Sequence, residues 1–275
     1  MNIGIIGTGN MGKILIEAFI KSSAVNEQNL FIMNRTKAKA EQIQIIYPEI
    51  HLVDCLEDIV KNTSYIFICI KPQDIYPLLK GLTPLLKNEQ CIVSITSPIS
   101  VKQLESIMPC SVARVIPSIN NRVLSGTSLL SFGDHCAVQH QEFIENLMMK
   151  ISTPLIIEEN ITRVASDITS CGPAFFTFLL RQFIDAAVEE TSITREQATL
   201  LASKMIIGLG QLLEQEVYTL ETLQEKVCVK GGITGEGIRI MEEEIGEMFN
   251  HVIQQTHAKF LHEKEKINEQ FCIKD

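Results

Sequence analysis

The sequence has no apolar run long enough to cross a bilayer, and the longest, such as residues 65–70, fall far short of a membrane span. It also has no basic stripe with interleaved aromatic residues. The formal net charge is −9, from 24 basic and 33 acidic residues, which disfavours a partner with a phosphate backbone. The chain opens directly into a strand-like segment, so we expect no targeting peptide. These absences predict a cytoplasmic protein that binds neither membranes nor nucleic acid.

Metal-binding patterns are missing as well. The cysteines form no C-x-x-C pair, none stands with a histidine at zinc spacing, and the histidines form no ligand cluster. We therefore expect no metal site. The thiols expected to stay reduced are those of Cys55, Cys69, Cys91, Cys110, Cys136, Cys171, Cys228 and Cys272.

A glycine-rich motif is present at the N-terminus, where a strand-like run leads into G-x-G-x-x-G and then a helix-like segment. This order is typical of a dinucleotide-binding βαβ unit. Gly7 would allow a sharp turn, Gly9 would let a pyrophosphate approach the backbone, and Gly12 would let the helix pack close to the sheet. An ordinary glycine-rich turn is the alternative. The residues expected to bind the pyrophosphate are Gly7, Thr8, Gly9, Asn10, Met11 and Gly12.

The next strand-like run, residues 30–33, ends without the acidic residue that an NAD site would place there. Asn34, Arg35 and Thr36 follow instead, and then Lys37, and we expect the first three of these to hold the 2′-phosphate of the cofactor. Arg35 can form a bidentate bond with a 2′-phosphate, and Thr36 can donate a hydrogen bond to it. NADP(H) is therefore favoured over NAD(H). The alternative is that Arg35 and Lys37 only solvate the start of a surface helix.

The first part of the chain alternates strand-like and helix-like segments, whereas from about residue 161 apolar residues recur at helical spacing. We therefore expect an α/β fold: a Rossmann-type doubly wound parallel sheet in residues 1–160, followed by an all-α domain in residues 161–275. Ligands bind such sheets beyond the carboxyl ends of the strands, which would bring Lys71, Pro72 and Ser118 to one crevice.

Two expected helices of the second half, residues 174–190 and 195–216, are apolar around nearly their whole circumference. A helix of this kind needs cover on nearly all sides. We therefore expect part of this surface to be buried in a second copy of the chain.

Two further segments could form a binding site. Residues 167–174 combine hydroxyl groups with Gly-Pro at an expected helix start, which would offer free N–H donors to an anion such as a carboxylate. At such a start Cys171 would have a lowered pKa. Residues 227–237 are dense in glycine, and Thr234 adds a hydroxyl at another expected helix start. Plain helix capping and a flexible interhelix loop are the respective alternatives.

Taken in order, these segments resemble the pyrroline-5-carboxylate reductase family over almost the whole chain. The matching pieces are residues 6–12, 70–72, 114–117, 171–175, 185–187 and 227–234. The resemblance implies a helical dimerisation domain, a homodimer or a higher oligomer, and reduction of the cyclic imine carboxylate 1-pyrroline-5-carboxylate to L-proline. It also implies that Lys71 and Pro72 line the nicotinamide side, that Gly231 and Gly232 hold the substrate carboxylate, and that the hydroxyl of Thr234 lies near the imine nitrogen.

Several substrate-side positions depart from the family pattern. Ser118 stands where the family has asparagine, Ser170 where it has glycine, and Cys171 where it has serine. The altered set resembles one branch of the family, the ComER-type proteins of bacterial late-competence operons. Two functions stay open: reduction of this or a related substrate, or a regulatory role in which NADP(H) is bound without turnover. The substrate-side candidates are Ser118, Cys171, Gly231, Gly232 and Thr234, with Thr234 as the catalytic residue.

Overall fold

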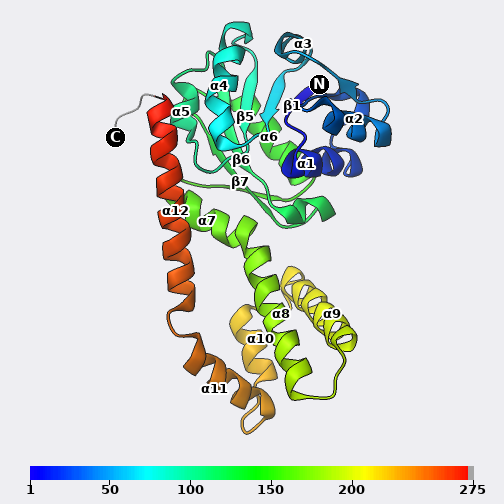
Figure 1. Ribbon diagram of the computed structural model, residues 1–275, viewed down its shortest axis with the longest axis vertical. Coiled ribbons are helices and arrows are strands. Elements are labelled where there is room, and N and C mark those ends of the chain that lie inside the picture. Colours follow the sequence, from blue (N-terminus) through cyan, green and yellow to red (C-terminus); the bar gives the residue numbers. More distant parts are fainter. Residues whose placement is uncertain (272–275) are drawn as a thin grey trace. The chain divides into compact units, whose positions relative to one another are not determined.

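The computed structural model describes residues 1–271, so Cys272 lies outside the described part of the chain. Within that part, eight strands form one sheet in the order β3-β2-β1-β4-β5-β6-β7-β8 (Figure 1). The strands are β1 (Ile3–Ile6), β2 (Leu30–Met33), β3 (His51–Leu52), β4 (Tyr65–Ile68), β5 (Cys91–Ser94), β6 (Ser111–Ile116), β7 (Thr127–Phe132) and β8 (Thr153–Ile156).

The first six strands in chain order run parallel, as the alternation of strands and helices predicts. The predicted parallel sheet is confirmed for these strands, and beyond them the sheet becomes mixed. β7 pairs antiparallel with β6, in a register that sets Ile116 opposite Leu129, and β8 then runs parallel to β7. Only a short 3₁₀ segment, Ile119–Val123, lies between β6 and β7. A parallel return needs a crossover of a dozen or more residues, so this connection brings the chain back antiparallel.

The helices are α1 (Asn10–Lys21), α2 (Lys37–Ile46), α3 (Leu56–Asn62), α4 (Pro72–Leu82), α5 (Val101–Glu105), α6 (Val138–Met149), α7 (Thr162–Ser166), α8 (Gly172–Glu190), α9 (Arg195–Glu214), α10 (Leu220–Val227), α11 (Ile233–Ile245) and α12 (Met248–Phe271). Among the described residues, no helix is both long enough and apolar enough to span a membrane.

Apolar side chains project from both faces of the sheet, as a doubly wound fold requires. On one face the core includes Ile5 and Phe67 with Leu15 of α1, Ile43 of α2 and Ile144 of α6. On the other face, Ile6, Ile66 and Ile92 pack with residues of α3, α4, α5 and the C-terminal end of α12. Both faces of the central strands are therefore covered, and their buried positions read as continuous apolar runs.

Packing divides the chain into two compact units. The first unit carries the predicted nucleotide-binding turn and is named the nucleotide-binding unit after it; it comprises residues 1–171 and 255–271 of the described chain. The helical unit comprises residues 172–254. The return to the first unit is carried by α12, whose Ile267 and Phe271 are buried in its core. The domain ranges 1–160 and 161–275 stay a prediction, and neither end of the helical unit coincides with them.

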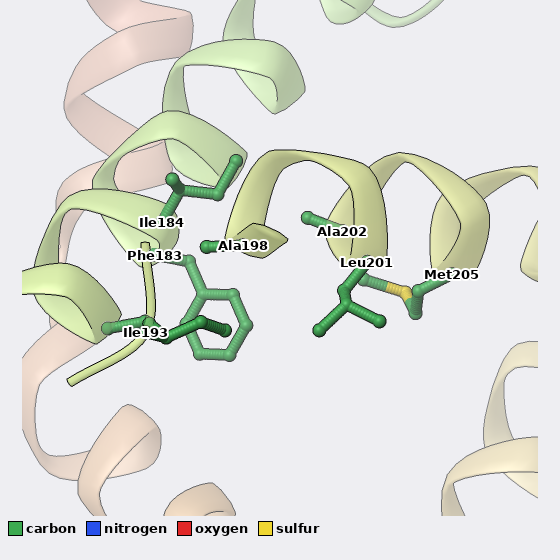
Figure 2. Close-up of a pocket in the computed structure, with 8 residues that line it drawn as sticks. Phe183, Ile184, Ile193, Ala198, Leu201, Ala202 and Met205 are labelled. Carbon is green, nitrogen blue, oxygen red and sulfur yellow. The ribbon is translucent and has the colours of Figure 1, made fainter. Parts of the chain in front are cut away.

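The helical unit keeps much apolar surface exposed within one chain. Phe176, Phe178 and Phe183 of α8 are 64%, 57% and 67% exposed. A pocket of about 230 Å³ between α8 and α9 is lined by apolar side chains alone (Figure 2). The lining residues are Phe183, Ile184, Ala187, Ile193, Ala198, Leu201, Ala202 and Met205. The helices α8 and α9 are thus apolar on most sides, and within a single chain much of this apolar surface stays exposed.

The expected helix start in residues 167–174 is absent. The helical path begins at Thr162 with α7, widens into a π-helical turn over Asp167–Cys171, and continues directly into α8. Pro173 has no N–H to donate, and a widened turn is one way for a helix to accommodate a proline. Because this segment lies inside a helix, it does not offer the free N–H groups of a helix N-terminus.

Candidate cofactor and substrate site

The turn after β1 has the geometry of a dinucleotide cradle. Gly7 has φ of +102°, a conformation that L side chains rarely adopt, and its N–H donates to Met33 O at 2.8 Å. A Cβ on Gly12 would lie 2.0 Å from Gly7 O, so the close approach of α1 to the turn requires glycine. A Cβ on Gly9 would meet nothing within 4 Å. The space beside Gly9 is therefore open at the N-terminus of α1, where a pyrophosphate would gain N–H contacts.

Thr8 gives a second indication that this turn binds a phosphate group. Thr8 is 5% exposed, and its backbone N–H donates to Asn34 Oδ1 at 2.9 Å. Its hydroxyl is buried and has no hydrogen-bond partner within residues 1–271. Since buried polar groups are nearly always paired, an unpaired hydroxyl on this turn fits a site completed by a bound phosphate group.

Asn34 and Arg35 follow β2 and lie beside that turn. The Asn34 amide donates to Thr36 O at 2.9 Å while accepting from Thr8, so it braces the two loops against each other. The side chain of Arg35 is 90% exposed, and its guanidinium is 3.9 Å from the carboxylate of Asp74. A contact this long and exposed holds Arg35 weakly. Its guanidinium therefore stays available to a phosphate.

Lys37 is engaged differently. Its ammonium group lies 2.8 Å from the Asp54 carboxylate, and this hydrogen bond raises the pKa of Lys37. The charge that the sequence suggested for a 2′-phosphate is thus shared with a carboxylate. Neither Asp54 nor Asp74 was expected near the site, because both are distant in sequence from β2.

Lys71 and Pro72 stand where β4 gives way to α4, as the N-cap and first residue of that helix. They border a pocket of about 310 Å³ within the nucleotide-binding unit, which α12 closes on its other side with Lys259, Glu263 and Lys266. The expected position of Lys71 and Pro72 beyond a strand's carboxyl end is therefore observed. Their contact with the nicotinamide stays a prediction.

The hydroxyl of Ser118 is used by the fold. Ser118 is fully buried, and its Oγ donates to Thr169 O at 2.7 Å. In the opposite direction, Ser170 Oγ donates to Pro117 O at 3.1 Å. These two bonds fasten the π-helical turn to the end of β6. A substrate role for Ser118 stays a prediction, and donation to a substrate would require the hydroxyl to leave Thr169 O.

Cys171 ends that turn, and its Sγ lies 3.3 Å from Arg163 Nη2. Burial raises the pKa of Cys171 despite the nearby Arg163 guanidinium, which lowers it. The expectation of a lowered pKa is wrong, because Cys171 lies at the end of a continuous helical path rather than at a helix start, and the thiol is partly desolvated.

Gly231, Gly232 and Thr234 belong to the helical unit. Gly231 has φ of +74°, and Gly232 is the N-cap of α11. A Cβ on Gly232 would lie 2.8 Å from Val229 Cγ2 and 3.0 Å from Val229 O, so a side chain there would crowd the turn. Thr234 is exposed in the first turn of α11, and no side chain caps that helix. Its first N–H groups have no side-chain acceptor at the N-cap, which suits the carboxylate cradle predicted for this loop.

Arg114 is a buried residue whose structural importance the sequence did not reveal. It is fully buried on β6, and its guanidinium lies 2.8 Å from both Glu159 Oε2 and Thr162 Oγ1. It also donates to Ser97 O at 3.2 Å. The sequence did contain one signal of this role, because Arg114 stands within the apolar run of β6. An arginine buried there must be paired with acceptors.

Comparison with known proteins agrees with this architecture. A family model described as pyrroline-5-carboxylate reductase dimerisation matches residues 159–262, and one described as NADP oxidoreductase, coenzyme F420-dependent, matches residues 2–98. The chain belongs to the pyrroline-5-carboxylate reductase family, with an NADP oxidoreductase match in its first part.

Among its relatives, ComE operon protein 4 of Bacillus subtilis (strain 168) is 52% identical over 273 residues, covering 99% of this chain and 100% of that protein. The expectation of a competence-operon relative is thereby confirmed. Pyrroline-5-carboxylate reductase 3 of the same organism is 29% identical over 259 residues, covering 94% of this chain and 95% of that protein.

Solved structures share the fold. A Plasmodium falciparum pyrroline carboxylate reductase with NADP bound aligns with a TM-score of 0.79 at 19% identity, covering 98% of both chains. A 1-pyrroline-5-carboxylate reductase from Streptococcus pyogenes aligns with a TM-score of 0.82 at 20% identity, covering 94% of this chain and 98% of that one. An α/β unit followed by helices is thus the architecture of this family, as the sequence predicted.

Proposed function

We propose that this protein is an NADPH-dependent reductase of a cyclic imine carboxylate, with 1-pyrroline-5-carboxylate as substrate and L-proline as product. The observation that carries the proposal is the turn after β1. Gly7 and Gly12 fix its shape, the space beside Gly9 is open, and the buried hydroxyl of Thr8 has no partner within residues 1–271. Membership of the reductase family over the full chain supports the choice of reaction.

The cofactor is held, in this proposal, by backbone N–H groups of Gly9 to Gly12 and by the Thr8 hydroxyl at the pyrophosphate. Arg35 and Thr36 bind the 2′-phosphate, because the side chain of Arg35 is 90% exposed and has only a long contact with Asp74. Asn34 keeps the loop in place through its bond to Thr8. The bound cofactor supplies the hydride.

The substrate is held by the loop before α11. Its carboxylate accepts hydrogen bonds from the N–H groups of Gly231 and Gly232, and Thr234 offers its hydroxyl to the imine nitrogen. Few titratable groups are needed, since a protonated imine is already electrophilic. The protein then has to position the substrate and exclude water.

Self-association is part of this proposal. The family's dimerisation model covers the helical unit, and α8 and α9 carry large exposed apolar side chains in the single chain. Pairing of two copies through these helices would bury that surface and give a homodimer or an oligomer of dimers. Light scattering at micromolar concentration tests it, and a monomeric mass would contradict it.

A second function is supported by the altered substrate-side residues. The Ser118 hydroxyl is engaged with Thr169, and Cys171 contacts Arg163 instead of an open space. A protein that binds NADP(H) and acts on a regulatory partner, in competence or a related developmental state, would need the cofactor turn but not this pocket. Reduction of a different cyclic imine or keto acid is compatible with the same residues.

NADPH oxidation with 1-pyrroline-5-carboxylate, measured beside NADPH binding by fluorescence, decides between these functions. Saturable turnover with proline formation supports the reductase. Binding without turnover on this substrate or on a panel of cyclic imines and keto acids supports the regulatory function. Failure to bind NADPH contradicts both.

A further inference from the structure

The chain passes between its two compact units twice. It leaves the nucleotide-binding unit between Cys171 and Gly172, and it returns between Gln254 and Gln255. Both passages lie in helices, the first where the π-helical turn meets α8 and the second within α12. Side chains that bind these helices just inside the nucleotide-binding unit are in a position to control both connections.

Asp167 binds both helices with one carboxylate. It is 2% exposed, and it lies at the start of the π-helical turn on the outgoing path. Its Oδ1 accepts a hydrogen bond from Arg163 Nη2 at 2.9 Å. Its Oδ2 accepts one from Thr256 Oγ1 at 2.7 Å, and Thr256 is the second residue after the chain has returned. The outgoing and returning segments are thus joined 89 residues apart in sequence.

Arg163, the positively charged partner of Asp167, also contacts both the outgoing and the returning helix. Its side chain is 13% exposed and paired with Asp167. The same Nη2 lies 3.3 Å from Cys171 Sγ, at the last residue before the outgoing passage. Its guanidinium lies 5.6 Å from the ring centroid of Phe260 on the returning helix. Arg163 and Asp167 together therefore contact both connections.

The outgoing turn is also fastened to the sheet. Ser118 donates to Thr169 O, and Ser170 donates to Pro117 O, directly after β6. The cluster of Arg163, Asp167 and Thr256 is therefore continuous with the edge of the sheet beyond the carboxyl ends of the parallel strands, where such folds bind ligand.

A buried ion pair is a poor way to gain stability, because apolar side chains of similar volume do as well or better. Its directional bonds, however, hold groups in one geometry. We propose that Asp167 is a positioning residue: with Arg163 and Thr256 it locks the two connections of the helical unit into one anchor, and so sets how the loop at Gly231–Thr234 is presented for catalysis. The catalytic consequence rests on the proposed function, whereas the anchor itself does not.

Thr256 allows a test that spares the ion pair. Thr256→Val keeps the shape of the side chain and removes the hydroxyl that binds Asp167, while Thr256→Ser keeps the hydroxyl. Thr83→Val is the matched control, since its hydroxyl donates to Leu79 O at 2.8 Å within the same unit but away from both connections. Asp167→Asn adds a variant that retains an acceptor but loses the charge facing Arg163.

The first readout is hydrogen exchange of the full-length protein. In Thr256→Val we expect exchange to rise by about tenfold in residues 167–172 as well as in residues 252–258, with Thr256→Ser near the wild type. The dissociation constant for NADPH should stay within about twofold. Faster exchange around residue 256 alone, with the outgoing turn unchanged, overturns the anchor.

The second readout is steady-state kinetics with 1-pyrroline-5-carboxylate. We expect Thr256→Val and Asp167→Asn to lower kcat/KM for the imine by about tenfold or more while the KM for NADPH is unchanged, and Thr256→Ser to restore it. An equal loss in Thr83→Val, or a parallel rise in the KM for NADPH, overturns the positioning role. If the wild type shows no turnover, the proposed function fails, and hydrogen exchange still decides the anchor.

Discussion

Asn34 accepts the N–H of Thr8 at 2.9 Å, so the residue that follows β2 holds the turn that follows β1. The same amide donates to Thr36 O. The two segments expected to bind opposite ends of the cofactor's adenosine diphosphate portion are therefore one hydrogen-bonded structure. A substitution at Asn34 should therefore affect both the turn after β1 and the loop after β2.

Asn34→Asp should lower NADPH affinity more than NADH affinity. The aspartate keeps an acceptor for Thr8, so the turn after β1 stays formed, but it loses the donor that binds Thr36 O. Its charge also repels a 2′-phosphate and suits ribose hydroxyl groups. We expect a loss of about tenfold or more for NADPH in fluorescence titrations. Equal losses for both cofactors would place the 2′-phosphate elsewhere.

Arg35→Ala should weaken NADPH binding by about tenfold or more and leave NADH binding nearly unchanged, because only the 2′-phosphate would use the guanidinium. Lys37→Ala is the matched control, since Lys37 is paired with Asp54 at 2.8 Å. The control should change NADPH affinity by no more than about twofold. A control effect as large as that of Arg35→Ala would contradict the assignment.

Gly9→Ala and Gly12→Ala should separate binding from folding. A Cβ on Gly12 would lie 2.0 Å from Gly7 O, whereas one on Gly9 would meet nothing within 4 Å. We expect Gly12→Ala to lower the free energy of unfolding by about 2 kcal/mol or more in urea denaturation. Gly9→Ala should unfold like the wild type but lose NADPH affinity. Unchanged NADPH affinity in Gly9→Ala would show that the open space is not where the cofactor binds.

Thr234→Ala should lower kcat for imine reduction by about a hundredfold without changing NADPH affinity, and Thr234→Ser should recover most of the rate. Thr234 is exposed in the helical unit, so neither substitution should affect folding. Turnover that survives in Thr234→Ala but falls in Arg35→Ala would leave only the cofactor assignment standing.

His140 should make stability depend on pH. It is 5% exposed, its Nδ1 lies 2.9 Å from the Tyr65 hydroxyl, and burial lowers its pKa below the ordinary 6.5. The unfolded chain therefore takes up a proton at a higher pH than the folded protein. Stability should fall as the pH drops through 6.5, by at most about 1.4 kcal/mol per pH unit. In His140→Gln, urea denaturation between about pH 7 and pH 5 should show a smaller loss. An identical pH profile in the two proteins would refute this.

The first βαβ unit follows closely from local sequence. The helix-like segment predicted after the glycine motif is observed as α1 (Asn10–Lys21), and the predicted strand at residues 30–33 is β2 (Leu30–Met33). Strand runs, glycines and turn residues specify such units through short-range chemistry. The glycine requirement at Gly12 also arises within this unit, from Gly7 O, whereas a Cβ on Gly7 would collide with the backbone of Cys69, which follows β4.

Features that depend on partners distant in sequence could not be predicted from the local sequence. β8 was missed because it is a short, largely exposed edge strand that contains Pro154. The ion pairs of Lys37 with Asp54 and of Arg163 with Asp167, and the bond from Thr256 to Asp167, are settled by packing. The capping residues predicted a helix start near Gly172. The preceding residues are already helical, so α8 continues the helix that begins with α7 and has no separate start there.

The return of α12 to the first unit has a consequence for synthesis on the ribosome. Ile267 and Phe271 belong to the core that covers Ile66 and Ile92, yet they are translated after the entire helical unit. The part of this face of the sheet that α12 covers therefore stays exposed, beside α3, α4 and α5, until residues 172–254 have left the exit tunnel. The order of translation makes the last turns of the chain the closing step in the folding of its first half.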